Sequence, residues 1–299
     1  MKFAFSADQL EFRDGLRELL SKECTAAHVR AAWTNATGRV PGLWTQLVAM
    51  GVTGLLVPEA DGGLGMEYVD LVLLLEETGR CAVPEPIIET AAMGAPLLRD
   101  ATVTVAGAHE FVPWADTADL IFTAAGQFDP ATATLTPHAS VDGARRLFTV
   151  SGSAQPVTGD VAAAFDRGVL GAAAQQCGLA DRMLELTVGY VKERQQFGTP
   201  VGSFQAVKHH LANARLALEF ARPLVYRAAV TLDRVHVSMA KRKADDAALT
   251  TAKVALQCHG AIGYTTEYDL HLYMKRAWAL ARSYGDARFH RDRVGAALT

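Results

Sequence analysis

Residues 190–208, which read Y-V-K-E-R-Q-Q-F-G-T-P-V-G-S-F-Q-A-V-K, place groups suited to binding phosphate at the junction of two predicted helices. Glycine and proline break the helical pattern in the middle, and Ser203 is a plausible N-cap for the second helix. The break brings Arg194, Phe197 and Gln205 to neighbouring helix ends. They offer a planar cation for phosphate oxygens, an aromatic face and an amide. The simpler alternative is a helix on which Arg194 is a solvated surface charge.

The elements that must position these residues are mostly helices. In the first hundred residues, apolar side chains recur at helical spacing in four segments, 6–23, 43–50, 68–79 and 89–98. From residue 160 onward the helical pattern returns over 162–197, 203–236, 241–259 and 268–283. Long helices joined by short breaks imply an antiparallel four-helix bundle. Gly79 is expected to mark the end of the third helix.

The stretch between these helical parts has a different character. β-Branched runs split by Gly, Pro and Asp predict short strands at 102–105, 120–123, 133–136 and 146–150. The fold class is therefore expected to be mainly α. We expect an N-terminal helical domain over 1–100, a reduced β-rich middle module over 101–159 and the bundle over 160–299.

Composition excludes several classes of protein. The net charge of -3 and the pI near 6.3 give no basic surface, so a nucleic-acid partner is not expected. The N-terminus has no signal-peptide h-region and no apolar run approaches ~18 residues, so we expect a soluble, cytoplasmic protein without a membrane segment. Four cysteines without a CxxC pair predict free thiols, and no metal site is expected.

Residues 190–208 resemble the Y-x-x-x-R-x-x-F-G-x-P-[IV]-x-x-F-Q-x-[VI]-[KQ] signature of the acyl-CoA dehydrogenases, flavoenzymes that desaturate acyl thioesters between Cα and Cβ. Residues 43–65 also look like the N-terminal helical domain of that family. The resemblance covers residues 3–98 and 160–283. It implies FAD as cofactor, with Arg194 on the pyrophosphate and Phe197 and Gln205 at the adenosine end.

A second matching stretch, residues 257–269, resembles the family's Q-x-x-G-G-x-G-[FY]-x-x-E-x-P. In the family this helix end packs on the adenosine diphosphate half of FAD, and the resemblance assigns Gln257, Gly260 and Ala261 to that groove. Gly260 and Gly263 would supply a backbone without side chains where the ligand approaches. Ala261 stands in place of the family's second glycine. An ordinary glycine C-cap is the alternative explanation of this segment.

Three family features are missing from the middle and the end of the chain. No counterpart of the family's T-E-P-x-A-G-S-D segment exists here. The W-I-T-N-x-x-x-A-D element has its best counterpart in 111–119, where Pro113 replaces the hydroxyl donor and Trp114 is out of register by three positions. In place of the Y-E-G-T motif the chain reads Tyr284-Gly285-Asp286-Ala287, with glycine where the catalytic carboxylate should be.

Two carboxylates could replace the missing base. A minority of the family places the base in a Glu-Arg pair on an earlier helix, where this chain has Asp166, one methylene shorter. The alternative for Asp166 is a carboxylate that faces the positive end of a helix dipole. Asp286 is the second candidate, one position late. Losing a positioned general base costs about 10²–10⁴ in rate.

The chain therefore resembles the shortened, partly degenerate subunit of actinobacterial α2β2 heteromeric acyl-CoA dehydrogenases. The resemblance implies a full-length homologue as partner, an acyl-CoA substrate with a fatty or steroid acyl group, and a FAD site contributed in trans. It leaves an electron-transfer flavoprotein open as electron acceptor. One alternative is a self-sufficient homo-oligomeric dehydrogenase that uses Asp166 or Asp286. The other is a structural or regulatory helical protein without flavin.

Overall fold

The computed structural model describes residues 4–100, 103–107 and 111–298. The first part is a group of short helices: α1 (Ala7–Glu23), α2 (Ala26–Ala32), α3 (Leu43–Ala49), the 3-10 turn η1 (Glu59–Asp61), α4 (Tyr68–Arg80), the π-helix η2 (Ile88–Gly94) and α5 (Ala95–Leu98). Ser6 caps α1 and forms a capping box with Gln9. The helix predicted over 89–98 is thus a π-helix followed by one α-helical turn.

The middle of the chain forms two small three-stranded sheets rather than one. The strands are β1 (Val105–Gly107), β2 (Val112–Pro113), β3 (Leu120–Thr123), β4 (Gly126–Phe128), β5 (Thr134–His138) and β6 (Leu147–Ser151), and the 3-10 turn η3 (Ala115–Thr117) follows β2. One sheet has the order β1-β3-β4 with a parallel β1–β3 pair, and the other has the antiparallel order β2-β6-β5. The sequence predicts four of these strands. β2 and β4 are too short for an alternating pattern, and Thr102 lies outside the described residues.

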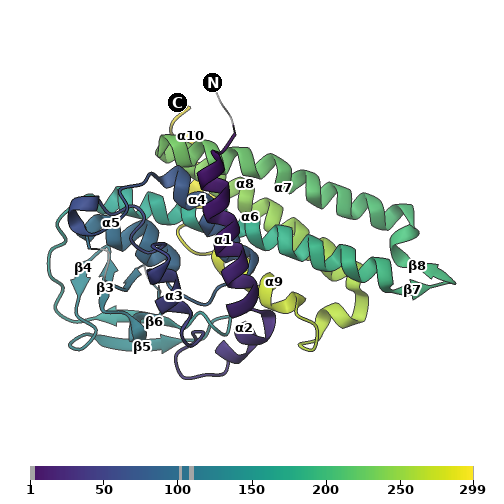
Figure 1. Ribbon diagram of the computed structural model, residues 1–299, viewed down its shortest axis with the longest axis horizontal. Coiled ribbons are helices and arrows are strands. Elements are labelled where there is room, and N and C mark those ends of the chain that lie inside the picture. The colour runs from purple at the N-terminus through teal and green to yellow at the C-terminus, as the bar shows by residue number, and fades with distance from the viewer. Residues whose placement is uncertain (1–3, 101–102, 108–110, 299) are drawn as a thin grey trace.

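Four helices follow, as predicted: α6 (Val161–Glu193), α7 (Gln205–Thr231), α8 (Arg234–His259) and α9 (Leu270–Leu280). The turn between α7 and α8, at Leu232 and Asp233, lies inside the span predicted as one helix (203–236), so that predicted boundary is wrong. A further helix, α10 (Ala287–Gly295), was not predicted. α6 packs against α7, α8 and α9 along its length, and α10 packs against α8. Figure 1 shows the bundle extending away from the two small sheets, which lie at its other end beside α3 and α5.

Glycines join the N-terminal helices to the bundle. A Cβ at Gly79 would lie 2.2 Å from the backbone oxygen of Gln175, and one at Gly178 would lie 1.9 Å from the backbone oxygen of Glu76. Only glycine therefore permits this approach of α4 to α6. α4 ends at Arg80, within one residue of the end predicted from Gly79-Arg80. The missing side chain of Gly79 also serves the packing of α4 on α6.

The structure also describes the cysteines and the apolarity of the helices, two features about which the composition made predictions. The four cysteines are free, two of them buried. Among residues 4–100, 103–107 and 111–298, no helix combines the length and apolarity needed to cross a bilayer. One core cluster extends from α1 through α4 and α6 to α9, and a second, smaller one lies between the strands.

Candidate functional site

The end of α6 leads into an exposed hairpin. α6 ends immediately before Arg194, and β7 (Gln195–Gln196) then pairs with β8 (Thr199–Pro200). Phe197 and Gly198 form the tip with φ angles of 53° and 74°, the positive pair that a type I′ turn requires. A phenylalanine in this region of backbone space is uncommon. Its side chain is 93% exposed, and Figure 1 shows the hairpin at the far end of the bundle.

The chain returns from the hairpin through the 3-10 turn η4 (Val201–Ser203). The Val201 N–H donates to the carbonyl oxygen of Arg194 at 2.8 Å, which folds the turn back onto the end of α6. α7 then begins at Gln205, so Arg194, Phe197 and Gln205 lie at one end of the bundle, as predicted. All three are exposed. Among the described residues, none accepts a hydrogen bond or salt bridge from the Arg194 guanidinium.

The start of α7 differs in one detail from the prediction. Phe204, not Ser203, is the N-cap residue, and no side chain caps the helix. The Ser203 hydroxyl is already used by the turn, because it donates to the carbonyl oxygen of Pro200 at 2.7 Å. The free N–H groups of the first turn of α7 thus face solvent beside Gln205.

The end of α8 presents the second predicted segment. Gln257, Gly260 and Ala261 are exposed, and a 3-10 turn, η5 (Gly260–Tyr264), follows the helix. Gly260 has φ 63° and ψ -139°, a conformation suited to glycine, and a Cβ there would meet nothing within 4 Å. Gly263 is different. It is buried, and its Cβ would lie 3.0 Å from that of His259, so its glycine serves internal packing rather than ligand approach.

Three aromatic rings tie these two helix ends together. Tyr190, one turn before Arg194 on α6, stacks on His259 at the end of α8 with ring centroids 4.5 Å apart. Tyr268 contacts both rings, at 5.9 Å from Tyr190 and 4.7 Å from His259. The cluster fixes the Arg194 end against the Gly260 turn. Sequence reasoning missed it, although Tyr190 and His259 both lie within the recognised motifs.

Burial favours the neutral form of the histidine in this cluster. It lowers the pKa of His259, and the hydrogen bond from Nδ1–H to the carbonyl oxygen of Ala255 at 2.8 Å acts in the opposite direction. A neutral imidazole can stack on Tyr190 without placing a charge in the interior. The role of His259 is therefore to position the turn that carries Gly260.

The two carboxylates proposed as bases both have structural partners. Asp286 is the N-cap of α10 and accepts from the N–H groups of Arg288 and Phe289, which lowers its pKa. Asp166 accepts from Arg293 Nη1 on α10 at 2.5 Å. Both therefore anchor α10. Asp166 also lines a cavity of about 220 Å³, together with Arg167 and residues at the start of α8.

The interior beneath Tyr284 is occupied by the chain's own side chains. The Tyr284 hydroxyl donates to Glu89 Oε1 at 2.5 Å, and Glu89 projects from the π-helix η2. Arg145 lies on the other side, 3.9 Å from the same carboxylate and donating to Ser283 Oγ at 2.6 Å. Burial raises the pKa of Glu89, and Arg145 opposes that effect. Sequence reasoning missed Glu89, because an isolated glutamate in a helical pattern gives no signal.

Two glycines show how closely this interior is packed. A Cβ at Gly168 would lie 2.5 Å from the sulfur of Met93 and 3.1 Å from the ring of Tyr284. Gly285 has a φ of 91°, and a Cβ there would lie 2.4 Å from the ring of Phe289. The position where the sequence lacks a carboxylate therefore has no room for a side chain in this packing.

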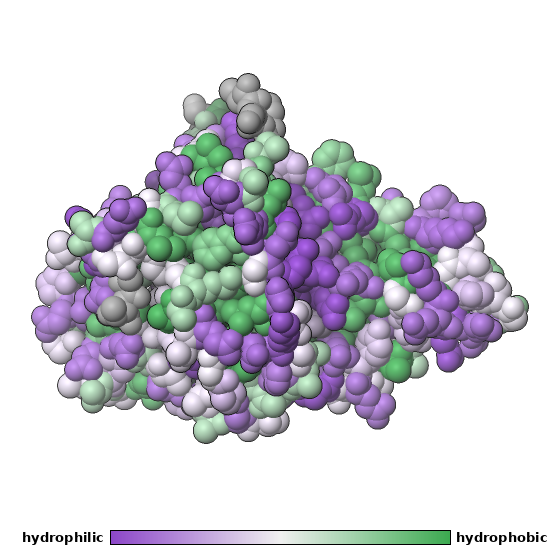
Figure 2. All heavy atoms as spheres, viewed as in Figure 1, coloured by the Kyte–Doolittle hydropathy of each residue, from purple (hydrophilic) through white to green (hydrophobic). Residues whose placement is uncertain are grey.

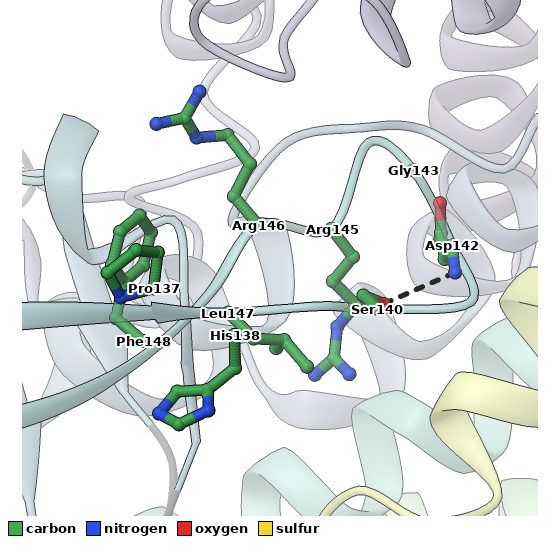
Figure 3. A pocket seen from close by; sticks show the side chains of 9 residues that line it. All are labelled: Pro137, His138, Ser140, Asp142, Gly143, Arg145, Arg146, Leu147 and Phe148. Atoms are coloured by element: carbon green, nitrogen blue, oxygen red, sulfur yellow. Dashed lines mark hydrogen bonds between the residues drawn. The ribbon is translucent and has the colours of Figure 1, made fainter.

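A cavity of about 170 Å³ lies in the middle module, along the turn between β5 and β6 (Figure 3). Figure 3 shows Arg145 and Arg146 pointing to opposite sides of this turn. Arg146 bonds Asp116, and the buried Asp142 pairs with Arg276 of α9. The charged residues that line this cavity are thus already paired, and the ion pair between Asp142 and Arg276 fastens the β5–β6 turn to the bundle. Within the described residues, His, Cys, Asp and Glu side chains form no cluster of three or more that could hold a metal.

Family models match both helical parts of the chain. Residues 159–299 match the model described as acyl-CoA dehydrogenase, C-terminal domain, and residues 6–105 match the N-terminal domain of the same family. Among curated proteins, the acyl-CoA dehydrogenase IpdE2 of Mycolicibacterium smegmatis is 36% identical over 300 residues, covering 93% of this chain and 96% of that protein. IpdE2 of Mycobacterium tuberculosis is 34% identical, covering 90% and 91%.

Solved structures show the same fold. The ChsE4-ChsE5 complex from Mycobacterium tuberculosis contains a chain that superposes with a TM-score of 0.86 at 22% identity, covering 100% of this chain and 99% of that one. Butyryl-CoA dehydrogenase from Megasphaera elsdenii superposes with a TM-score of 0.85 at 21% identity, covering all of both chains.

Proposed function

The chain belongs to the acyl-CoA dehydrogenase family, which is FAD-dependent, and we propose that it works as one subunit of a two-chain acyl-CoA dehydrogenase. In this proposal the complex desaturates an acyl-CoA thioester between Cα and Cβ. This chain contributes the binding site for the pyrophosphate and adenosine end of FAD, and the partner holds the flavin ring and the base. The complex contains two of each chain.

The observation that carries the proposal is a difference between the exposed residues of α7 and those of α8 on the outer surface of the bundle. Leu216, Phe220 and Val230 are 54%, 68% and 70% exposed on α7, and their spacing places them on one stripe of the helix, which also carries the exposed polar residues His209, Asn213 and Arg227. Gln205 lies on the same stripe, at its end nearest the hairpin. Figure 2 shows hydrophobic patches along the edge formed by α7. A stripe with three large exposed apolar side chains that ends in a predicted cofactor contact suits a partner that brings the cofactor with it.

The outer stripe of α8 is different and supports the same assignment. Its exposed residues are Met239, Lys243, Thr250, Lys253 and Gln257, which are polar except for the first. The partner is therefore expected on α7, with α8 contributing mainly its end, at Gln257 and Gly260.

The residues at the bundle end fit the anionic half of FAD. The exposed Arg194 guanidinium can donate two hydrogen bonds to pyrophosphate oxygens. Phe197 offers an aromatic face, and the open space before Gly260 admits a ligand to the backbone. The interior beneath Tyr284 does not fit the flavin ring, because Glu89 and Met93 fill it.

The reaction removes two hydrogens from the substrate. When bound, FAD would supply the acceptor for the hydride that leaves Cβ, and a carboxylate of the partner would take the α-proton, so that the product would be a trans-2-enoyl-CoA. This chain's residues bind and orient: Arg194 holds phosphate charge, and the ring cluster of Tyr190, His259 and Tyr268 keeps the two helix ends in register. An electron-transfer flavoprotein is the proposed acceptor of the electrons.

Known relatives support a two-chain complex and a steroid or other lipid acyl group. The solved structures with this fold include the steroid acyl-CoA dehydrogenase Tcur3481-Tcur3483, in its G363A variant, and the ChsE4-ChsE5 complex. The IpdE2 proteins resemble this chain along nearly their whole length. The alternative, a homo-oligomer with its own base, is favoured only by the cavity beside Asp166.

The test is the FAD content of the purified complex. Replacing Arg194 with Ala should lower FAD occupancy about ten-fold or more without changing helical content, because a charge-assisted pair of hydrogen bonds is lost at the surface. Lys192→Ala is the matched control, since it removes an exposed cation from the same helix end. Equal occupancy in Arg194→Ala and wild type would contradict the trans site. A chain that is yellow and active without a partner would favour the homo-oligomer.

A further inference from the structure

A small cavity lies where the three parts of the chain meet. It measures about 10 Å³, roughly the space that one water molecule needs. Its wall comes from the segment around η2, from the middle module, and from α6 and α9. The lining residues are Glu85, Ile88, Glu89, Trp114, Arg145, Gln175, Arg276 and Leu280.

Two hydrogen-bond donors on this wall have no partner among the described residues. They are Nε1 of Trp114 and Nη2 of Arg276, and both side chains are 3% exposed. The other groups of Arg276 are satisfied, since Nε donates to Asp142 and Nη1 donates to the carbonyl oxygen of Val83 at 2.8 Å. A buried donor without an acceptor is costly, so each such group in a native protein calls for an explanation.

Acceptors stand on the same wall. Glu89 Oε1 accepts from the Tyr284 hydroxyl, and the two oxygens of Glu85 accept from Arg39 Nε at 2.5 Å and from the Val40 N–H at 3.2 Å. A carboxylate has about four lone-pair positions, so both glutamates keep acceptor capacity. The cavity therefore combines two free donors with two carboxylates.

We propose that one structural water molecule binds in this cavity. It accepts hydrogen bonds from Trp114 Nε1 and Arg276 Nη2 and donates to the wall carboxylates, which gives it the two to four partners typical of buried water. A halide ion is the other small ligand that two donors could hold. The wall disfavours it, because Arg145 and Arg276 are balanced by Glu85 and Glu89.

The water explains the position of Trp114. This indole, which is out of register with the family's flavin-contacting tryptophan, is buried on the inside of the middle module with a positive φ of 53°, and the Arg276 guanidinium lies 5.9 Å from its ring centre. Through the water it would link the middle module to η2 and to α9. The inference is independent of the proposed function.

The direct test is a crystal structure of the full chain, alone or with its partner, from crystals grown with bromide in place of chloride. The expected result is a solvent peak within hydrogen-bonding distance of Trp114 Nε1 and Arg276 Nη2 that has no anomalous signal. A cavity without density would overturn the proposal. An anomalous bromide peak would do so as well, since it would identify a halide site.

A matched pair of variants gives a second test. Trp33 Nε1 is also buried without a partner among the described residues, but Trp33 does not line the cavity. Trp33→Phe and Trp114→Phe remove the same atoms, and only the second removes a hydrogen bond to water. Trp114→Phe should therefore lower the thermal midpoint by about 2–4 °C more than Trp33→Phe. Equal shifts would contradict the water site.

Discussion

The two ends of this molecule use similar residue types in opposite ways. At the hairpin end, Arg194, Gln205 and Gln257 are exposed, and no described side chain occupies their functional groups. Beneath Tyr284, the charged groups are buried and paired with one another, as Glu89 is with Tyr284. At the hairpin end, the hydrogen-bonding groups are therefore free to bind a molecule outside the chain. Beneath Tyr284, the hydrogen-bonding groups bind one another and stabilise the fold.

Under the proposed function, this difference explains how a family member could keep one half of a site and lose the other. Residues that reach a ligand across an interface cost the chain little when they stay at the surface. An internal pocket must be filled or hydrated when its ligand is absent, because buried polar groups require partners. In this chain, the side chains of Met93, which packs on Gly168, and Glu89, which bonds Tyr284, fill the interior.

The largest expected effect concerns the outer face of α7. Phe220→Asp places a charge in the middle of the exposed apolar stripe and should weaken assembly with the partner about 100-fold or more, since central aromatic residues dominate interface energy. Sedimentation of the co-expressed chains measures this. Met239→Asp on α8 is the control and should assemble as wild type does. If the two variants assemble alike, the partner does not bind through α7.

The next effect tests whether the interior could regain a base. Gly285→Glu restores a carboxylate in sequence, but the φ of 91° and the contact with Phe289 leave no room for it. We expect no activity in the chain alone and a loss of about 2–4 kcal/mol in the free energy of unfolding. Denaturant titration and a dye-reduction assay measure the two. Gly285→Ala should be destabilised about as much, and any turnover in Gly285→Glu alone would show that the pocket is open.

A smaller effect depends on pH. Burial, aided by Lys241, lowers the pKa of His290 to about 4 from its ordinary value of 6.5, while the imidazole bonds Ser238 and the Tyr284 carbonyl. The unfolded chain takes up a proton as the pH falls below 6.5, and the folded chain does not until near 4. Stability from this group is therefore present above pH 6.5 and lost between 6.5 and 4. His290→Gln should show a flatter stability profile over that range, measured by urea unfolding.

The smallest expected effect concerns the two candidate bases. Asp166→Asn and Asp286→Asn should each leave turnover of the complex within a few-fold of wild type, because both carboxylates anchor α10 in the structure. Asparagine remains a good N-cap, so Asp286→Asn should hardly change stability. A loss of about 10² or more in either variant would place the base on this chain and reverse the subunit assignment.

Most of the helical fold could be predicted because long helices repeat their apolar pattern over many turns, as α6 and α8 do. Features that depend on contacts between distant residues could not be predicted. Gly79-Arg80 correctly marks the end of α4, but the close packing of Gly79 on α6 does not follow from the sequence pattern. Strands β2 and β4 have two and three residues, and their pairing rather than their sequence defines them.

The same distinction applies to the candidate site: its place in the fold could be predicted, but its contacts between distant residues could not. Motif spacing placed Arg194, Phe197 and Gln205 at one end of the bundle, as the structure has them. It could not show that Tyr190 stacks on His259, since that contact joins residues almost seventy positions apart. Nor could it show that Glu89 occupies the interior, because burial of a single glutamate follows only from three-dimensional packing.

The hairpin tip has a consequence for how the chain survives in the cell. Phe197 is the most exposed of the large hydrophobic side chains described here, and it stands on a two-residue turn at the end of the molecule. Exposed loop tips are preferred sites of proteolytic cleavage. A copy of this chain whose hairpin is uncovered would therefore be open to cutting between α6 and α7, within the segment that carries Arg194.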